Sequence, residues 1–305
     1  MTIAITVKDR KEEVIATFPK VDQNMTVQEF KKMFLKDCES MKKKKLYPAR
    51  IRFTIAEPRG TPLGDTQATM GSFITTPAVT LYFKDLGPQI GWDTVFYIEY
   101  AGPIVMTLAL LFFRKSIYGK DPALTLNQKL GVFMVIVHYV KRELETMFVH
   151  RFSSETMPFT NVFKNSLHYY GLFGFLTMYF YLHPDYTPPA WASPTLYYVA
   201  TAFFLLFEFL NLQTHLVLKN LRRPGSTERK IPYGWGFDQV SSANYLWETC
   251  AWVTFCVQAQ VLGGYVFLAA SLYQMAEWGL KKHKRYRQEF PNYPRNRKAI
   301  FPFLL

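Results

Sequence analysis

Six long apolar segments dominate the sequence between residues 94 and 280. Each approaches the roughly 20 residues that a helix needs to cross a bilayer. They are Thr94–Phe113, Leu130–Phe148, Ser166–Tyr181, Thr195–Leu218, Tyr245–Leu262 and Tyr265–Leu280. Residues before about Leu86 are charged instead, and the mean hydropathy of -0.03 averages these two populations. We therefore expect a soluble N-terminal domain followed by an α-helical membrane domain of about six transmembrane helices.

The soluble part has the pattern of a small α+β domain. Thr26 and Glu29 have the spacing of a capping box and precede apolar residues at helical spacing. The ββαββ order is similar to that of a ubiquitin-like β-grasp, although another small α+β fold would fit it too. Domains are expected at 1–86 and 87–305, joined by a linker at 85–89. The strands are expected at 2–8, 14–18, 50–55 and 78–83.

Loop charges indicate an orientation for the membrane domain. The net charge is +13, and basic residues cluster at segment ends, which fits cytosolic loops better than a nucleic-acid surface. The link 183–194 has no Lys or Arg and is expected in the lumen, whereas 219–230 is rich in both and is expected in the cytosol. Six spans then place both termini in the cytosol. Arg114, Lys115 and Lys120 oppose this orientation, although the first two could extend to lipid head groups.

Cysteine and histidine spacing argues against a metal site. Cys38, Cys250 and Cys256 show no paired spacing, which disfavours both a disulfide framework and a zinc site. The histidines lack clustered spacing as well, so no metal is expected. The first 13 residues are charged and strand-like, so no cleavable signal peptide is expected.

Ionisable residues inside the apolar segments are the first candidates for function. Glu99 lies in the first segment, where a charged group is costly and therefore points to a functional role. The alternative is a structural ion pair with Lys141 or Arg142 on the next segment. Burial could also make Glu99 a proton donor.

The second segment carries a polar set, His138, Tyr139, Lys141 and Arg142. These side chains lie within about one helical turn and cannot all face lipid, so they must line a cavity or pair with each other. A salt bridge from Lys141 to Glu145 at i,i+4 is the structural alternative.

Three further polar groups lie at the ends of later segments. Each has a structural alternative: a hydrogen-bonded interfacial histidine, cationic anchors at the cytosolic face, or a helix N-cap with an acidic first turn. No G-x-G-x-x-G follows a strand, so a bound dinucleotide would need a fold other than Rossmann. The groups are Asn211 with His215, Arg222 with Lys230, and Asn244 and Tyr245 with Glu248.

The motifs around these residues resemble the steroid 5α-reductase superfamily. Its NADPH-binding end is similar to Leu221-Arg222-Arg223-Pro224-Gly225, Ile231-Pro232, the run from Ser242 to Glu248, and the tail from Tyr286 to Lys298. Within the superfamily, the β-grasp extension, the linker and Tyr245 resemble the very-long-chain trans-2-enoyl-CoA reductases of fatty-acid elongation. The resemblance covers almost the whole chain.

The resemblance implies NADPH-dependent reduction of long-chain and very-long-chain trans-2-enoyl-CoA, with hydride to Cβ and a proton to Cα. Tyr139 with Glu99 would polarise the thioester carbonyl, an oxyanion-type effect. Lys141 matches the enoyl-CoA branch, and Tyr245 is a candidate proton donor. The implied cofactor contacts are His138, Arg142, Asn211, Arg222, Lys230, Asn244, Glu248 and Tyr286. The implied setting is the endoplasmic reticulum membrane, with its lipids and other elongase subunits as partners.

Three other functions fit the residues. A steroid or polyprenol enone reductase would use the same cofactor site. A membrane methyltransferase of the isoprenylcysteine type would bind S-adenosylmethionine instead. A lipid-binding or scaffold protein without catalysis would tolerate Phe at Tyr139 and Tyr245.

Overall fold

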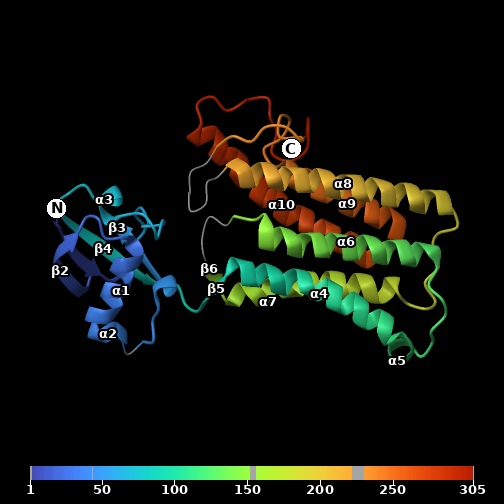
Figure 1. Ribbon diagram of the computed structural model, residues 1–305, viewed down its shortest axis with the longest axis horizontal. Coiled ribbons are helices and arrows are strands. Elements are labelled where there is room, and N and C mark those ends of the chain that lie inside the picture. Colours follow the sequence, from blue (N-terminus) through green and yellow to red (C-terminus); the bar gives the residue numbers. More distant parts are fainter. Residues whose placement is uncertain (1, 43, 152–155, 222–229, 305) are drawn as a thin grey trace. The chain divides into compact units, whose positions relative to one another are not determined.

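The structure, a computed structural model, forms two compact units (Figure 1). It describes residues 2–42, 44–151, 156–221 and 230–304. The first unit contains residues 2–92 together with 156–162, and the second contains residues 93–151 and 163–304. The sequence did not indicate that 87–92 and 156–162 group with the N-terminal residues.

The first unit is built on a four-stranded mixed sheet in the order β2-β1-β4-β3. The strand β1 pairs antiparallel with β2 and parallel with β4, and β3 pairs antiparallel with β4. Ile3, Ile5 and Val7 alternate into a core that also contains Phe30 and Phe34 of α1. This arrangement fits the predicted ββαββ order. The elements are β1 (Thr2–Lys8), β2 (Val14–Asp22), α1 (Val27–Asp37), β3 (Ile51–Ile55) and β4 (Ala78–Asp85).

Local hydrogen bonds explain where two of the helices begin. The predicted capping box is confirmed: the Thr26 hydroxyl accepts from the Glu29 amide, and the Glu29 carboxylate accepts from the Thr26 amide at 2.8 Å. A second capping box, which the sequence reading missed, starts α6 (Leu126–Phe148) with Thr125 and Gln128. Each box satisfies amides that a helix N-terminus leaves without partners.

The expected linker is shorter than predicted. Asp85 ends β4, and Gln89 begins a short strand, β5 (Gln89–Gly91), which pairs antiparallel with β6 (Thr156–Pro158). Hydropathy gave no sign of this pairing because the partner strand lies about 65 residues further along the chain. The remaining short elements of this unit are α2 (Glu39–Lys42), η1 (Pro48–Arg50) and α3 (Met70–Phe73).

An ion pair between Arg50 and Asp85 should make the first unit sensitive to acid. The Arg50 guanidinium donates from Nε and Nη2 to the two carboxylate oxygens, both at 2.7 Å. These bonds lower the pKa of Asp85 below its ordinary 3.8, so the unfolded chain binds this proton more tightly. The stabilisation is therefore complete above about pH 5 and is lost as pH falls through 3.8 towards the lower folded value. Both side chains are partly exposed, so screening by solvent keeps this contribution to stability small.

Amide hydrogen exchange of β3 and β4 in the full chain, followed from about pH 6 to about pH 3, measures this effect. Asp85→Asn should flatten the pH dependence. Identical profiles for the wild type and Asp85→Asn would contradict the prediction.

The second unit is helical, and a helix lies over each of the six predicted apolar segments. Among the described residues, two helices, α4 and α8, are long and apolar enough to cross a membrane by length and composition; six spans remain a prediction. In Figure 1, α6, α8, α9 and α10 run side by side, and α10 also packs against η2. The helices are α4 (Trp92–Phe112), α5 (Arg114–Tyr118), α6, α7 (Thr160–Ser166), η2 (Leu167–Tyr179), α8 (Pro194–Leu221), α9 (Ala243–Ala259) and α10 (Leu262–Glu289).

The third apolar segment departs from the expected α-helix. It starts as α7 and continues as the π-helix η2 over 13 residues. The Thr177 hydroxyl donates to the Leu172 carbonyl five residues earlier, at 2.9 Å. Such wide turns are uncommon and concentrate at functional sites.

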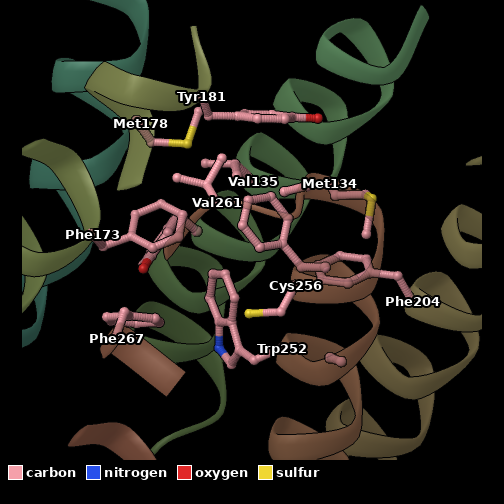
Figure 2. Packing of buried hydrophobic residues seen from close by; sticks show 14 of the residues in the cluster. Met134, Val135, Phe173, Met178, Tyr181, Phe204, Trp252, Cys256, Val261 and Phe267 are labelled. Carbon is pink, nitrogen blue, oxygen red and sulfur yellow. The ribbon is translucent and has the colours of Figure 1, made fainter. Parts of the chain in front are cut away.

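Aromatic side chains fill the centre of the helical unit. Figure 2 shows Trp252 of α9 beside Phe173 of η2 and Phe267 of α10, and both ring centroids lie 5.0 Å from that of Trp252. Tyr181 and Phe204 belong to the same fully buried cluster. This core joins α6, η2, α8, α9 and α10, and it therefore fixes the positions of the polar side chains on α6.

Arg114 does not extend outward to lipid head groups, as the sequence suggested it could. Its guanidinium is buried and donates from Nε to the Leu182 carbonyl at 3.2 Å and from Nη1 to the Pro122 carbonyl. Lys120 forms an ion pair with Asp185 at 2.7 Å. Because Arg114 and Lys120 both have partners within the unit, they are weaker evidence against the predicted membrane orientation.

Gly263 and Gly264 separate the fifth and sixth apolar segments, and the chain turns just before them. Gln260 takes the left-handed conformation, with φ of 49°, and both glycines lie in the first turn of α10. A Cβ on Gly263 would meet the Leu176 carbonyl oxygen at 2.1 Å, whereas one on Gly264 would meet Cys256 Sγ at 3.4 Å. Gly263 is therefore needed for close packing of α10 against η2.

Gly263→Ala should lower the free energy of unfolding by about 1–3 kcal/mol, because backbone must move to admit the methyl group. Gly264→Ala is the matched control and should change it by well under about 1 kcal/mol, since its contact is nearly ordinary. Thermal unfolding in detergent measures both. Equal losses in the two variants would contradict the packing argument.

Candidate functional site

The polar residues of α6 lie on one face of the helix. His138, Lys141, Arg142 and Glu145 follow spacings of three and four residues, which place side chains on one side of a helix. His138 and Glu145 are buried, and the side chains of Lys141 and Arg142 are 13% exposed. The sequence predicted that these side chains either line a cavity or pair with each other. The structure shows that they pair, in a network that includes residues from α8.

Glu208 of α8 is the centre of that network. Its Oε1 lies 2.7 Å from His138 Nδ1, and its Oε2 lies 2.8 Å from Lys141 Nζ. The other ring nitrogen of His138 lies 3.4 Å from Oε1 of Glu248 on α9. Glu208 itself is only 4% exposed. The sequence reading missed it, although an acidic residue inside an apolar segment was the signal that selected Glu99.

Two asparagines extend the network towards α9. Lys141 Nζ donates to Asn211 Oδ1 at 2.5 Å, and Asn211 Nδ2 donates to the Asn244 carbonyl at 2.9 Å. Glu248 accepts from Trp252 Nε1 at 3.0 Å. The structure thus brings together residues from α6, α8 and the start of α9. The sequence had predicted them separately, from three parts of the chain. We call His138, Lys141, Arg142, Glu145, Glu208 and Asn211 the polar cluster.

Arg142 connects the polar cluster to α4. Its Nη2 donates to the Tyr100 hydroxyl at 2.7 Å, and its Nη1 lies 2.8 Å from Glu145 Oε2. Glu145 Oε1 lies 3.0 Å from His215 Nδ1 and 3.5 Å from Lys141 Nζ. The predicted contact of Lys141 with Glu145 is therefore present, but Glu208 is the closer partner. Tyr100 was not selected from the sequence.

A possible metal donor set also arises here. Glu145, His150 and His215 present ligand atoms within 4.8 Å of one another, and this donor set is one that zinc accepts. Burial, followed by the charges of Arg142 and His215, lowers the pKa of His150 to about 3, so its ring is neutral at pH 7. Arg142 and Lys141 lie beside the same carboxylate and would repel a divalent ion. The geometry therefore favours a cluster of ion pairs and hydrogen bonds.

Glu99 is buried and has a partner that the sequence did not predict. Its Oε1 accepts a hydrogen bond from Asn165 Nδ2 at 2.6 Å. The alternative ion pair with Lys141 or Arg142 was wrong: among the described residues, these cations pair with Glu208 and Glu145. The predicted action of Glu99 with Tyr139 on a substrate carbonyl stays a prediction.

Tyr139 has a buried hydroxyl that makes no hydrogen bond with any described residue. Its side chain is 0% exposed, and its ring packs against Phe173, with 5.3 Å between centroids, and against His138, at 4.8 Å. A buried hydroxyl without a partner is costly, and native proteins rarely keep one without a reason. A polar atom of a bound molecule would satisfy it.

The start of α9 offers a second unpaired atom. Asn244 Oδ1 is buried and has no hydrogen-bond partner in the part of the chain that the structure describes. The backbone carbonyl of Asn244 is held by Asn211, so the side chain is positioned while its oxygen stays available. This fits an amide-bearing or hydroxyl-bearing group such as a dinucleotide supplies.

The remaining predicted residues lie further along the chain. Tyr245 is half-buried, and its ring centroid lies 6.3 Å from that of Trp278 on α10. Tyr286 is buried near the end of α10, with Lys282 Nζ 5.7 Å from its ring centre. Lys230 is exposed. Arg222 lies outside the described residues.

Arg297 is a buried cation in the tail that carries the resemblance, although it was not among the predicted site residues. Its Nη1 donates to the Pro232 carbonyl at 2.9 Å, and its guanidinium carbon lies 4.6 Å from the ring centre of Tyr233. The backbone of Ser241 and Ser242 also bonds to Lys298 and Ala299. The C-terminal tail thereby holds the loop that leads into α9.

Comparison with known proteins identifies the class of this helical unit. A family model described as 3-oxo-5-alpha-steroid 4-dehydrogenase matches residues 155–305. The very-long-chain enoyl-CoA reductase of Dictyostelium discoideum is 44% identical over 227 residues, which is 74% of each chain. A probable very-long-chain enoyl-CoA reductase of Caenorhabditis elegans is 39% identical over 306 residues, 97% of this chain and 96% of the relative. A trans-2,3-enoyl-CoA reductase-like protein of Mus musculus is 34% identical, covering 95% and 81%.

A membrane-associated oxidoreductase is therefore the class that the apolar helices, their buried polar residues and these relatives define. Within it, the chain belongs to the very-long-chain enoyl-CoA reductase family. This confirms the resemblance drawn from the motifs, and it implies a nicotinamide cofactor. It also favours a reductase over the methyltransferase and scaffold alternatives.

Proposed function

We propose that this chain reduces long-chain and very-long-chain trans-2-enoyl-CoA to saturated acyl-CoA with NADPH, the final step of the fatty-acid elongation cycle. The observation that carries the proposal is the unpaired Tyr139 hydroxyl, buried beside the polar cluster. The enoyl thioester group is uncharged, and its carbonyl oxygen gains negative charge during reduction. A preorganised buried donor is what such an oxygen requires.

Tyr139 donates a hydrogen bond to the thioester carbonyl oxygen in this proposal, with Glu99 helping to hold the substrate. The carbonyl then withdraws electrons from the double bond, and Cβ becomes electrophilic. NADPH, when bound, supplies the hydride that Cβ accepts. Tyr245 gives its hydroxyl proton to Cα, which completes the reduction. Lys141, held by Glu208 and Asn211, keeps positive charge close to the developing enolate.

The residues that would hold NADPH come from five parts of the chain. Asn244 has an unpaired oxygen, and Asn211 positions it. Arg222 and Lys230 would contact phosphate, which suits cations and above all the fork of an arginine. The full proposed set is His138, Arg142, Asn211, Arg222, Lys230, Asn244, Glu248 and Tyr286.

The proposed setting is the endoplasmic reticulum membrane. Helices over all six apolar segments and the distribution of basic loop residues support a multi-pass protein with both termini in the cytosol. We propose a β-grasp domain at 1–86 and a catalytic membrane domain at 87–305. Other elongase subunits are the expected protein partners.

NADPH oxidation by the purified protein in detergent tests the function, with a long-chain trans-2-enoyl-CoA as substrate and NADH as the cofactor control. Turnover specific to NADPH is the expected result. Steroid enones form a second arm, because the matching family model carries a steroid dehydrogenase description. Turnover of steroid enones alone, or NADPH binding without enoyl-CoA turnover, would overturn the substrate assignment.

A further inference from the structure

Four basic side chains from separate segments meet on the first unit. Arg52 of β3 and Lys84 of β4 are directly opposite one another in the strand register, so their side chains lie on the same face of the sheet. Arg10, in the turn after β1, and Arg59, in the turn after β3, line a surface hollow of about 250 Å³ with Pro58. We call Arg10, Arg52, Arg59 and Lys84 the basic patch.

The basic patch is held together against its own repulsion. The charge of Arg10, then burial, then the charge of Arg52 lower the pKa of Lys84, which shows how closely these cations approach. Like charges directly opposite one another across two strands destabilise a sheet. No patch residue forms an ion pair with an acidic side chain among the described residues of the chain.

The same two strands show how the fold neutralises a cation when no outside partner is involved. Arg50, next to β3, is neutralised by the two carboxylate oxygens of Asp85 at the end of β4. Arg52, two residues further along, faces Lys84 instead. Since no acidic side chain among the described residues pairs with the basic patch, an anion from outside the unit would relieve its repulsion.

We propose that the basic patch docks on the phosphate groups of anionic phospholipids at the membrane surface. Arginine presents two parallel N–H donors that match phosphate oxygens, and three of the four patch residues are arginines. The hollow beside Arg10 and Arg59 gives a phosphate group room to approach both side chains.

The short chain segment between the basic patch and α4 favours lipid over a soluble anion as the partner of the patch. Lys84 precedes Trp92, where α4 begins, by eight residues, a distance of at most about 28 Å even when fully extended. Because α4 is one of the two helices able to cross a membrane by length and composition, the patch stays within reach of head groups. Tethering raises the local concentration of lipid phosphate far above that of a free ligand, and basic residues beside a membrane helix are attracted to anionic leaflets.

Energy transfer in nanodiscs tests this docking with the full-length chain. A donor fluorophore is attached at the N-terminus, and an acceptor is carried by a trace lipid. Nanodiscs of pure phosphatidylcholine are compared with nanodiscs that contain about 30% phosphatidylserine, an anionic content that a basic patch should sense. For the wild type, we expect phosphatidylserine to raise the transfer efficiency about twofold and about 0.5 M salt to reverse it.

Two fourfold variants separate the patch from general charge. Each removes the same charge from the same unit, and the control residues are exposed lysines. The patch variant should lose the response to phosphatidylserine, and the control should keep it. The patch variant is Arg10→Gln, Arg52→Gln, Arg59→Gln and Lys84→Gln; the control is Lys20→Gln, Lys32→Gln, Lys36→Gln and Lys44→Gln.

Several outcomes would overturn the proposal. Equal transfer in both kinds of nanodisc for the wild type would show a solvated face, and equal losses in the two variants would show an effect of charge alone. If about 1 mM coenzyme A reversed the rise in transfer efficiency and added phosphatidylserine vesicles did not, the patch would instead bind a soluble phosphate compound. The melting temperature in phosphatidylcholine checks folding: it should stay level or rise in the patch variant, because repulsion is removed.

Discussion

Tyr139→Phe is expected to lower turnover by about 10²–10³-fold, the usual cost of losing one donor to a developing oxyanion. The free energy of unfolding should stay level or rise slightly. The hydroxyl is fully buried and has no hydrogen-bond partner among the described residues, so its removal breaks no internal bond. The ring keeps its contacts with Phe173 and His138. Steady-state kinetics and thermal unfolding of one preparation measure both effects.

Tyr181→Phe is the matched control, because this tyrosine is equally buried but fully bonded. Its hydroxyl donates towards the Asn127 carbonyl at 2.7 Å and Asn127 Oδ1 at 2.6 Å. Its loss should cost about 1–3 kcal/mol of stability, since buried acceptors lose their donor, and should leave turnover within a few-fold. If Tyr139→Phe instead lost stability and kept its turnover, Tyr139 would be a structural residue and the proposed carbonyl contact would be wrong.

Local features of the fold could be predicted because their signals lie within a few residues. The Thr26 and Glu29 capping box depends on a spacing of three, and the structure contains it. The one-sided face of His138, Lys141 and Arg142 depends on the helical repeat alone. Apolar length also predicted where the long helices lie, to within a few residues at most ends.

The partners of the site residues could not be predicted in this way. Glu208 pairs with His138 across 70 residues of sequence, and Asn165 reaches Glu99 across 66. No periodicity encodes which helix packs beside which, so the sequence offered Lys141 or Arg142 only as an alternative partner for Glu99 and gave no sign of Glu208 or Asn165. The winding of η2 was equally hidden, because an apolar segment has the same hydropathy whether its hydrogen bonds span four residues or five.

Glu208→Gln should show how strongly the buried charges of the site depend on one another. The substitution leaves Lys141 and His138 without the carboxylate that lies 2.8 Å and 2.7 Å from them. Removing one partner of a buried ion pair typically costs about 3–5 kcal/mol, because the other charge stays buried and uncompensated. Glu248 lies 3.4 Å from the other nitrogen of His138 and Glu145 lies 3.5 Å from Lys141, so neither is close enough to replace the missing carboxylate fully. Turnover should fall as well, since Lys141 loses its fixed position.

Glu143→Gln on α6 provides the control for removing one negative charge, because Glu143 is half-buried and contributes to no ion pair that the described residues form. Its stability should stay within about 0.5 kcal/mol of the wild type. Chemical unfolding in detergent gives the stability of both variants.

A double-mutant cycle with Lys141→Met isolates the pair of Glu208 and Lys141. The double variant should be more stable than Glu208→Gln alone, because the charge of Lys141 is then no longer left uncompensated. If Glu208→Gln were as stable as Glu143→Gln, or if the cycle gave no coupling, the carboxylate would not be the element that fixes Lys141, and the position of this cation would have to come from Asn211.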